Sequence, residues 1–163
     1  MSISEANVDA MGDDGGAGIG SGIDASLCGS IELYKSEIQA QSYDGGAGIG
    51  GGKAGVCGAI ICSESNIESH SREDGAGIGS GSYGSICGDI RIQSSNIETI
   101  ASFEAAAIGS GYESSSCGNI HIGPVQDGAN PTSIKRYGSD VIGAGENSSC
   151  GDVIIHPETN IIF

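Results

Sequence analysis

Apolar and polar residues alternate in short segments that recur along the chain. In IELYKSEIQA (31–40) and IRIQSSNIET (90–99), aliphatic residues mostly stand two apart, with charged, amide or hydroxyl residues between them. This period of two, carried by β-branched isoleucine, is typical of strands that bury one face. Gly, Ser, Asn and Asp fill the intervening stretches, which predicts turns. No segment shows the 3.6-residue period of a helix, so the pattern predicts an all-β chain.

The same pattern returns about every 30 residues. The dipeptide Cys-Gly recurs at spacings of 29, 30, 30 and 33 residues, at Cys28, Cys57, Cys87, Cys117 and Cys150. The isoleucine of a glycine-rich block recurs at spacings of 30, 29, 30 and 34 residues, at Ile19, Ile49, Ile78, Ile108 and Ile142. Each repeat contains a GAGIGSG part, a CGxIxI part and an SxIxA part. Two independent markers with one period indicate a tandem repeat, and we expect about five copies in a single domain, 1–163.

A repeat of this length with three short strands and no helix predicts one coil of a parallel β-helix, or β-solenoid. Its coils stack through backbone hydrogen bonds about 4.8 Å apart, so residues one repeat apart form columns. Three inward columns are expected: Ile31, Ile60, Ile90, Ile120 and Val153; Leu33, Cys62, Ile92, Ile122 and Ile155; and the five isoleucines of the glycine-rich blocks. With aromatic residues at only 4%, this thin aliphatic core predicts a narrow rod.

A leucine-rich repeat is the competing interpretation, because IELYKSEI fits the strand frame of such a repeat. Its return segment would then be helical or 3₁₀. That segment would have to be DGGAGIGGG, where each glycine costs a helix about 1 kcal/mol.

Glycine accounts for 30 of the 163 residues and concentrates in these blocks. If the isoleucine of each block points inward, its glycine neighbours point outward and leave bare backbone. The candidate ligand or interface face comprises Gly18, Gly20, Gly48, Gly50, Gly77, Gly79 and Gly109. Glycine in a strand marks a bend or a close approach by a backbone or a ligand. Two interpretations stay open: the glycines only let the coil bend, or the bare face packs against a glycan or a second copy.

Charge is one-sided, with 21 Asp and Glu against six Lys and Arg and a net charge of −15. Such a surface repels phosphates and anionic headgroups, so we expect no nucleic-acid partner. No segment reaches the roughly 18 apolar residues of a membrane span, so no membrane insertion is expected. Acidic residues precede the glycine-rich blocks at Asp14, Asp44, Asp74 and Glu104. We expect these residues either to cap turns or to bind Ca²⁺; no other cofactor is expected.

The five Cys-Gly cysteines should form a column of their own. Parallel side chains in a straight stack suit disulfide geometry poorly. We therefore expect mostly reduced, buried thiols that act as small hydrophobic side chains.

The fourth repeat is longer, and its extra sequence predicts a loop at 123–140. This segment, GPVQDGANPTSIKRYGSD, holds two of the three prolines and the cluster Lys135, Arg136 and Tyr137. Loops on a regular scaffold often carry recognition, so these three residues are candidates for contact with a sugar or an acidic partner. A tolerated insertion without a partner is the alternative.

The unit GAGIGSG…CGxIxI…SxIxA resembles glycine-rich tandem repeats in large surface proteins of gut bacteria and some protists. The resemblance implies a β-solenoid stalk or adhesin, displayed extracellularly or on the cell surface as part of a larger protein, and it implies no catalytic residues. The start MSISEANVDAMGDD has no signal-peptide pattern. We expect a non-enzymatic structural module that binds glycans or self-associates. A polysaccharide lyase or hydrolase of the β-helix class and an ice-binding protein are the alternatives.

Overall fold

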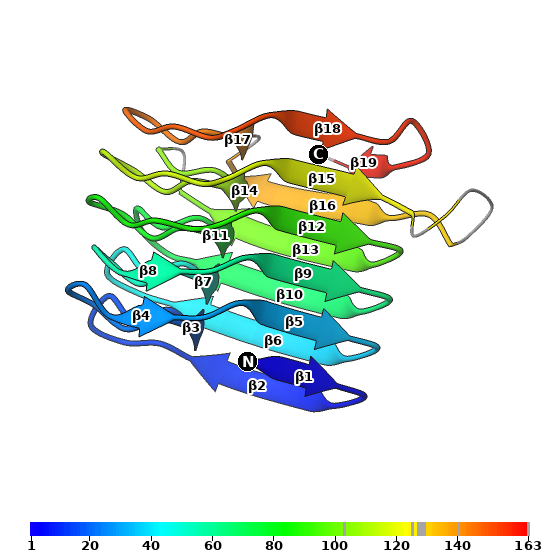
Figure 1. The fold of residues 1–163 in the computed structure, drawn as a ribbon, viewed down its shortest axis with the longest axis horizontal. Coiled ribbons are helices and arrows are strands. Elements are labelled where there is room, and N and C mark those ends of the chain that lie inside the picture. Colours follow the sequence, from blue (N-terminus) through cyan, green and yellow to red (C-terminus); the bar gives the residue numbers. More distant parts are fainter. Residues whose placement is uncertain (103, 125, 127–129, 140, 163) are drawn as a thin grey trace.

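The computed structural model is a parallel β-solenoid of about five coils with three strands in each coil (Figure 1). It describes residues 1–102, 104–124, 126, 130–139 and 141–162, and these ranges contain no helix. None of them therefore supplies an apolar helix of the length needed to cross a bilayer. The fold predicted from the repeat is confirmed, and the leucine-rich alternative is wrong, because the glycine-rich return segments form strands and turns.

Each part of the repeat contributes one strand to its own sheet. Sheet A holds the CGxIxI strands, β1 (Ser2–Ser4), β5 (Ile31–Tyr34), β9 (Ile60–Ser63), β12 (Ile90–Gln93), β15 (Ile120–Gly123) and β18 (Val153–Ile155). Sheet B holds β2 (Asn7–Met11), β6 (Glu37–Ser42), β10 (Asn66–Ser71), β13 (Asn96–Ala101), β16 (Ser133–Gly138) and β19 (Asn160–Ile162). Sheet C holds the two-residue strands β3 (Ile19–Gly20), β7 (Ile49–Gly50), β11 (Ile78–Gly79), β14 (Ile108–Gly109) and β17 (Ile142–Gly143). A minor pair, β4 (Leu27–Cys28) and β8 (Val56–Cys57), precedes sheet A.

The strand registers bring together the residues that the spacing predicts. Ile31 pairs with Ile60 and Ile60 with Ile90, and the column continues through Ile120 to Val153. The other two expected columns are formed in the same way in sheets A and C. Sheet B adds a column that the sequence reasoning did not name: Val8, Ile38, Ile67, Ile97, Ile134 and Ile161. The central isoleucines of these columns are fully buried and form one continuous core.

The molecule is not the narrow rod expected from its thin core. Its longest dimension runs along the strands of each coil and not along the stack (Figure 1). Strands of four to six residues in sheets A and B make each coil wide. The result is a broad stack with an extended outer surface on each sheet.

A buried serine column closes the turn from sheet A to sheet B. The Ser65 hydroxyl donates to the Ser63 carbonyl at 2.9 Å and accepts from the Ser36 amide of the preceding coil at 3.1 Å. Ser95 repeats the same contacts one coil later. The residue before each serine, such as Glu64 with a φ of 49°, takes a left-handed conformation that turns the chain sharply. One hydroxyl thus serves a partly buried carbonyl and a buried amide on neighbouring coils.

The predicted loop at 123–140 is shorter than expected, because Ser133–Gly138 forms strand β16 in register with β13. Ile134 takes the place of Ile97 in the core column and fixes that register. Residues 125, 127–129 and 140 of the predicted loop lie outside the described residues.

Candidate functional site

The outer face of sheet B carries two rows of polar side chains that run across the strands. Successive residues of a strand point to opposite faces, so the neighbours of the buried Ile38, Ile67 and Ile97 point outward. The first row is Asn7, Glu37, Asn66, Asn96, Ser133 and Asn160. The second row is Asp9, Gln39, Glu68, Glu98 and Lys135, and it ends at the apolar Ile162.

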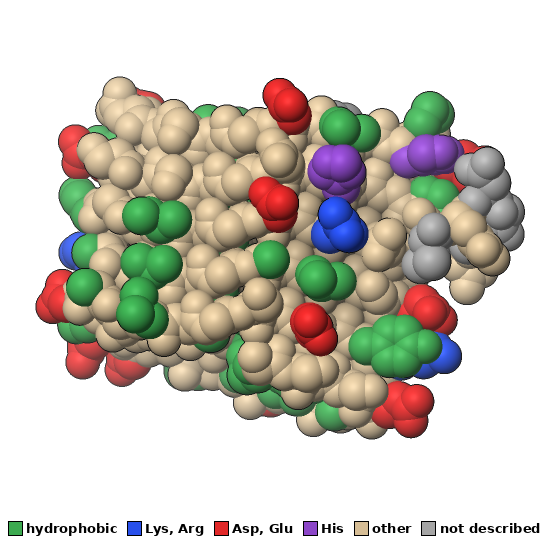
Figure 2. All heavy atoms as spheres, in the orientation of Figure 1, with side chains coloured by type: hydrophobic (Ala, Val, Ile, Leu, Met, Phe, Trp, Pro, Cys, Tyr) green, Lys and Arg blue, Asp and Glu red, His purple; other side chains and the backbone are tan. Residues whose placement is uncertain are grey.

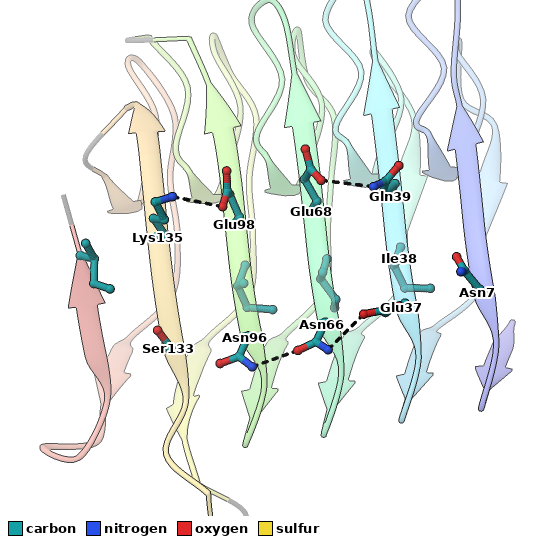
Figure 3. A pocket seen from close by; sticks show the side chains of 13 residues that line it. Asn7, Glu37, Ile38, Gln39, Asn66, Glu68, Asn96, Glu98, Ser133 and Lys135 are labelled. Atoms are coloured by element: carbon teal, nitrogen blue, oxygen red, sulfur yellow. Dashed lines mark hydrogen bonds and ion pairs between the residues drawn. The ribbon is translucent and has the colours of Figure 1, made fainter.

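Hydrogen bonds between coils order parts of both rows (Figure 3). In the first row, Asn96 Nδ2 donates to Asn66 Oδ1 at 2.9 Å, and Asn66 Nδ2 donates to Glu37 Oε1 at 3.4 Å. In the second row, Gln39 Nε2 donates to Glu68 Oε2 at 3.4 Å. Each amide keeps unused donors and acceptors, which stay available to a ligand.

A groove of about 530 Å³ lies between the two rows and crosses sheet B from Asn7 to Lys135. In Figure 3 the side chains of the two rows stand apart, with Ile38 between them. Because Ile38 and its equivalents are buried, the floor is largely the strand backbone with thin apolar patches. The groove therefore offers polar walls with a repeat of one strand spacing, about 4.8 Å.

The groove is acidic. Among its described lining residues, Glu37, Glu68 and Glu98 face a single cation, Lys135, whose Nζ lies 3.4 Å from Glu98 Oε2. A hydrogen bond with Tyr137 and the Glu98 carboxylate raise the pKa of Lys135, so its ammonium stays charged at neutral pH. Since this ammonium is already paired with Glu98, the walls favour neutral or cationic ligands over anionic ones.

The outer face of sheet A carries a second, smaller hollow of about 330 Å³. It is lined by Arg91, His121, His156 and Ile154, and basic side chains gather on this part of the surface in Figure 2. It spans strands β12, β15 and β18 only. It lacks the long paired rows that mark the groove on sheet B.

The glycine columns do not form the exposed face expected from the sequence. Gly50, Gly79 and Gly109 are buried, and a Cβ added at Gly79 would point into the next coil, 1.8 Å from the Gly109 carbonyl oxygen. Gly48 and Gly77 lie against Ser69 and Thr99 of sheet B, inside the coil, and Gly18 lies against the Gln41 backbone. Gly20, at the first coil, is the one exposed member of the predicted set. The glycines thus allow close approach between backbones, which is one of the roles considered for them.

Strand β16 places the three residues of the predicted loop contact on opposite faces of sheet B. Lys135 and Tyr137 lie on the outer face of β16, with the Lys135 ammonium 4.9 Å from the centre of the Tyr137 ring. Arg136 is only 5% exposed, because the alternation of the strand turns it inward to the position of Thr99. Arg136 is therefore wrong as a surface contact, whereas Lys135 lines the groove.

Two of the four predicted calcium residues come together. Asp14 and Asp44 lie with Asp13 on exposed turns of neighbouring coils, each offering an oxygen within 4.8 Å of the others. Asp74 and Glu104 are not part of this group among the described residues. The Asp74 carboxylate instead raises the pKa of Tyr83.

The cysteine column contains one disulfide, between Cys117 and Cys150. Cys28, Cys57, Cys87 and the core residue Cys62 are free thiols. The expectation of mostly reduced cysteines therefore holds for four of the six, and it is wrong for the last pair of the column.

The sequence reasoning did not predict the rows of sheet B, because the glycine-rich blocks carry the stronger repeat pattern. Their signal lay in the SEIQA, SNIES and SNIET segments, where Glu37, Asn66 and Asn96 stand at one repeat position and Gln39, Glu68 and Glu98 at another. Comparison with protein-family models, curated proteins and solved structures gave no match, so the function is inferred from the geometry of this groove.

Proposed function

We propose that the protein is a non-enzymatic β-solenoid module that binds a linear, hydroxyl-rich glycan along the groove of sheet B. One observation carries the proposal: two rows of amide and carboxylate side chains line a groove that crosses the strands. A polymer lying in it would meet a hydrogen-bonding group on each wall about every 4.8 Å. Sugar hydroxyls both donate and accept, which matches amides beside carboxylates.

The charge of the groove narrows the ligand class. Glu37, Glu68 and Glu98 would repel uronic acid or sulfate groups, so neutral or amino-bearing glycans are favoured. The resemblance to surface-protein repeats supports the same function, and with it display on or outside the cell. Calcium at Asp14 and Asp44 remains a separate prediction that this proposal does not require.

The test is a binding assay with soluble polysaccharides of different charge. Neutral glucans and xylans, chitosan and polygalacturonate are titrated calorimetrically with the wild-type protein after a glycan-array screen. We expect binding to a neutral or amino-bearing polymer and none to polygalacturonate. Asn66→Ala and Glu68→Gln should each weaken binding about 3- to 10-fold, as expected for one lost hydrogen bond.

Glu32→Gln is the matched control, because Glu32 is an exposed acid on the outer face of sheet A. It should leave binding unchanged. Equal losses in Glu32→Gln and Glu68→Gln, or no binding to any neutral or amino-bearing polymer, would contradict the proposal. Release of reducing or unsaturated sugar during the titration would instead favour the lyase or hydrolase alternative. Ice binding has less support, because Thr99 and Thr132 are fully buried and offer no threonine row on the surface.

Self-association is a second candidate function. We propose that its interface lies at the ends of the stack and not at the glycine face. β1 and β18 are the edges of sheet A, and β2 and β19 are the edges of sheet B. Val153 and Ile155 occupy inward positions yet are 40% and 37% exposed, because β18 is the last described strand of sheet A. Unpaired edges beside apolar residues favour pairing with another chain. Sedimentation velocity should show concentration-dependent assembly that Ile155→Lys abolishes; a monomer at all concentrations would exclude it.

A further inference from the structure

The column of five cysteines joins thiols and a disulfide in one line. Cys28 and Cys57 are paired in register, and the bridges from Val56 to Ile86, from Ile86 to Ser116 and from Ser116 to Ser149 carry the column through the remaining coils. Its members in order are Cys28, Cys57, Cys87, Cys117 and Cys150. Each of the three inner cysteines therefore has one cysteine in the coil above it and one in the coil below it.

The last two cysteines show that neighbouring coils bring sulfurs within bonding reach. Cys117 and Cys150 form a disulfide with a Cα–Cα separation of 4.6 Å, within the usual range for disulfides. Cys87 lies one coil below Cys117, and its backbone amide donates to the Ser116 carbonyl at 2.9 Å. A free thiol thus occupies the next place in a column that ends in a disulfide.

Thiol–disulfide exchange requires the attacking, central and leaving sulfurs to lie roughly in line. A thiolate attacks one sulfur of a disulfide, and the other sulfur departs on the far side. In the column, Cys87 is on one side of Cys117 and Cys150 is on the other. The attacking, central and leaving sulfurs are therefore in sequence along the stacking direction.

We propose that the cysteine column is an exchange relay, in which the disulfide moves from Cys117–Cys150 to Cys87–Cys117 and frees the Cys150 thiol. The Cys87 thiolate forms a bond to Cys117 Sγ, the Cys117–Cys150 bond breaks, and Cys150 leaves as a thiolate that takes a proton from water. The number of disulfides stays constant, so no oxidant or reductant is consumed. The relay makes partly exposed Cys150 a site for modification by thiol-directed reagents or for a mixed disulfide with a thiol partner.

Hydrogen bonding and burial within the column govern how readily Cys87 ionises. A hydrogen bond from Cys87, together with one from Cys28, lowers the pKa of Cys57 despite partial burial. The same hydrogen bond and burial raise the pKa of Cys87. The Cys87 thiol therefore ionises less readily than an ordinary thiol, so the exchange should be slow at neutral pH. Because exchange needs the thiolate, its rate should rise with pH.

The experiment follows where the disulfide lies over time. The native protein is incubated at mildly alkaline pH with an alkylating reagent, quenched in acid, unfolded and treated with an isotopically heavy form of the same reagent. Peptide mapping then identifies disulfide-linked and labelled cysteines. In the wild type we expect native labelling of Cys150 to grow with time, together with an equal amount of the Cys87–Cys117 peptide.

Three variants separate the relay from other causes. Cys87→Ser removes the nucleophile and should reduce Cys150 labelling to background. Cys57→Ser keeps Cys87 and should still release Cys150. Cys62→Ser changes a buried thiol outside the column and should match the wild type. Circular dichroism confirms that each variant is folded before labelling.

Two results would overturn the proposal. One is a wild-type protein that retains only the Cys117–Cys150 peptide with Cys150 unlabelled after prolonged incubation. The other is undiminished Cys150 labelling in folded Cys87→Ser, which would assign the release to another route, such as exchange between molecules.

Discussion

Replacing Gly79 by alanine tests why the glycine-rich blocks recur. Gly79 has a φ of 142°, in a region that is essentially restricted to glycine and costs another residue about 1–3 kcal/mol. Its added Cβ would lie 1.8 Å from the Gly109 carbonyl oxygen, whereas real Cβ atoms essentially never come within 3.0 Å of a neighbouring atom. The strain and the clash add, because relief of the contact requires two paired strands of sheet C to separate. We expect Gly79→Ala to lower the free energy of unfolding by at least about 3 kcal/mol.

Alanine substitutions at two other glycines separate the cost of backbone strain from the cost of the steric clash. Gly84 has a φ of 81°, and an added Cβ would meet nothing within 4 Å, so alanine there should cost only the strain of about 1–2 kcal/mol. Gly29 has open space and no left-handed φ, so alanine should be neutral or stabilise by up to about 1 kcal/mol through the unfolded chain. We expect Gly29→Ala to be the most stable of the three variants, Gly84→Ala to be intermediate and Gly79→Ala to be the least stable.

Urea and thermal unfolding followed by far-UV circular dichroism measure all three variants under one condition. For a chain of this size, about 3 kcal/mol corresponds to a fall in Tm of roughly 6–12 °C. The reasoning fails if Gly79→Ala is no less stable than Gly84→Ala, because the close approach between coils would then carry no energetic cost.

The remaining predictions concern buried polar groups, a thiol and a surface ion pair. Ser65→Ala should lower stability by about 1–3 kcal/mol in urea unfolding, because it leaves the buried Ser36 amide without its acceptor. Burial raises the pKa of Cys62 from 9.0 to about 12, so the folded state holds this proton while the unfolded state loses it above pH 9. The free energy of unfolding should therefore fall as pH rises from about 9 to about 12. The urea midpoints measured at about pH 8 and about pH 10 should differ less in Cys62→Val than in the wild type. Lys135→Ala, which breaks the exposed pair with Glu98, should leave Tm in thermal unfolding nearly unchanged, because exposed ion pairs contribute little to stability.

The stacking of the coils was predictable because equal spacing fixes the register. Ile49 and Ile78 are 29 residues apart in the sequence and directly paired in sheet C. When every coil has nearly the same length, a residue can lie above only one partner without moving the isoleucines out of the core. The period alone therefore places the three named columns, and the same logic extends to the column through Ile38 and Ile67.

The direction of the glycines was not predictable from alternation. That argument assumes an extended strand, but β7 and β11 are only two residues long. Gly50 and Gly79 leave the regular strand conformation with φ values of 134° and 142°, so their missing side chains would point along the stack and not outward. A conformation open mainly to glycine is not encoded by the pattern of polar and apolar residues.

Arg136 was misplaced for a different reason. The extra residues between Ile122 and Ile134 hide the register, so Ser133–Gly138 reads as part of a loop. Once Ile134 occupies the core column, the alternation of the strand forces Arg136 inward. The disulfide was not expected because parallel side chains in a straight stack suit disulfide geometry poorly, although the Cα atoms of Cys117 and Cys150, 4.6 Å apart, are within bridging reach.

If the groove binds a polymer as proposed, the repeat supplies contacts that a chain with few aromatic residues otherwise lacks. Stacking places Asn66 beside Asn96 and Glu68 beside Glu98, so each coil adds one weak contact to each wall of the groove. Contacts that recur with the strand spacing act together on a ligand that is itself repetitive, and their joint effect exceeds that of any one hydrogen bond. The cysteine column depends on the same stacking, since it brings thiols from distant parts of the sequence into one line. A single change of register would disrupt both, which makes the isoleucine core the physical basis of the groove and of the cysteine column.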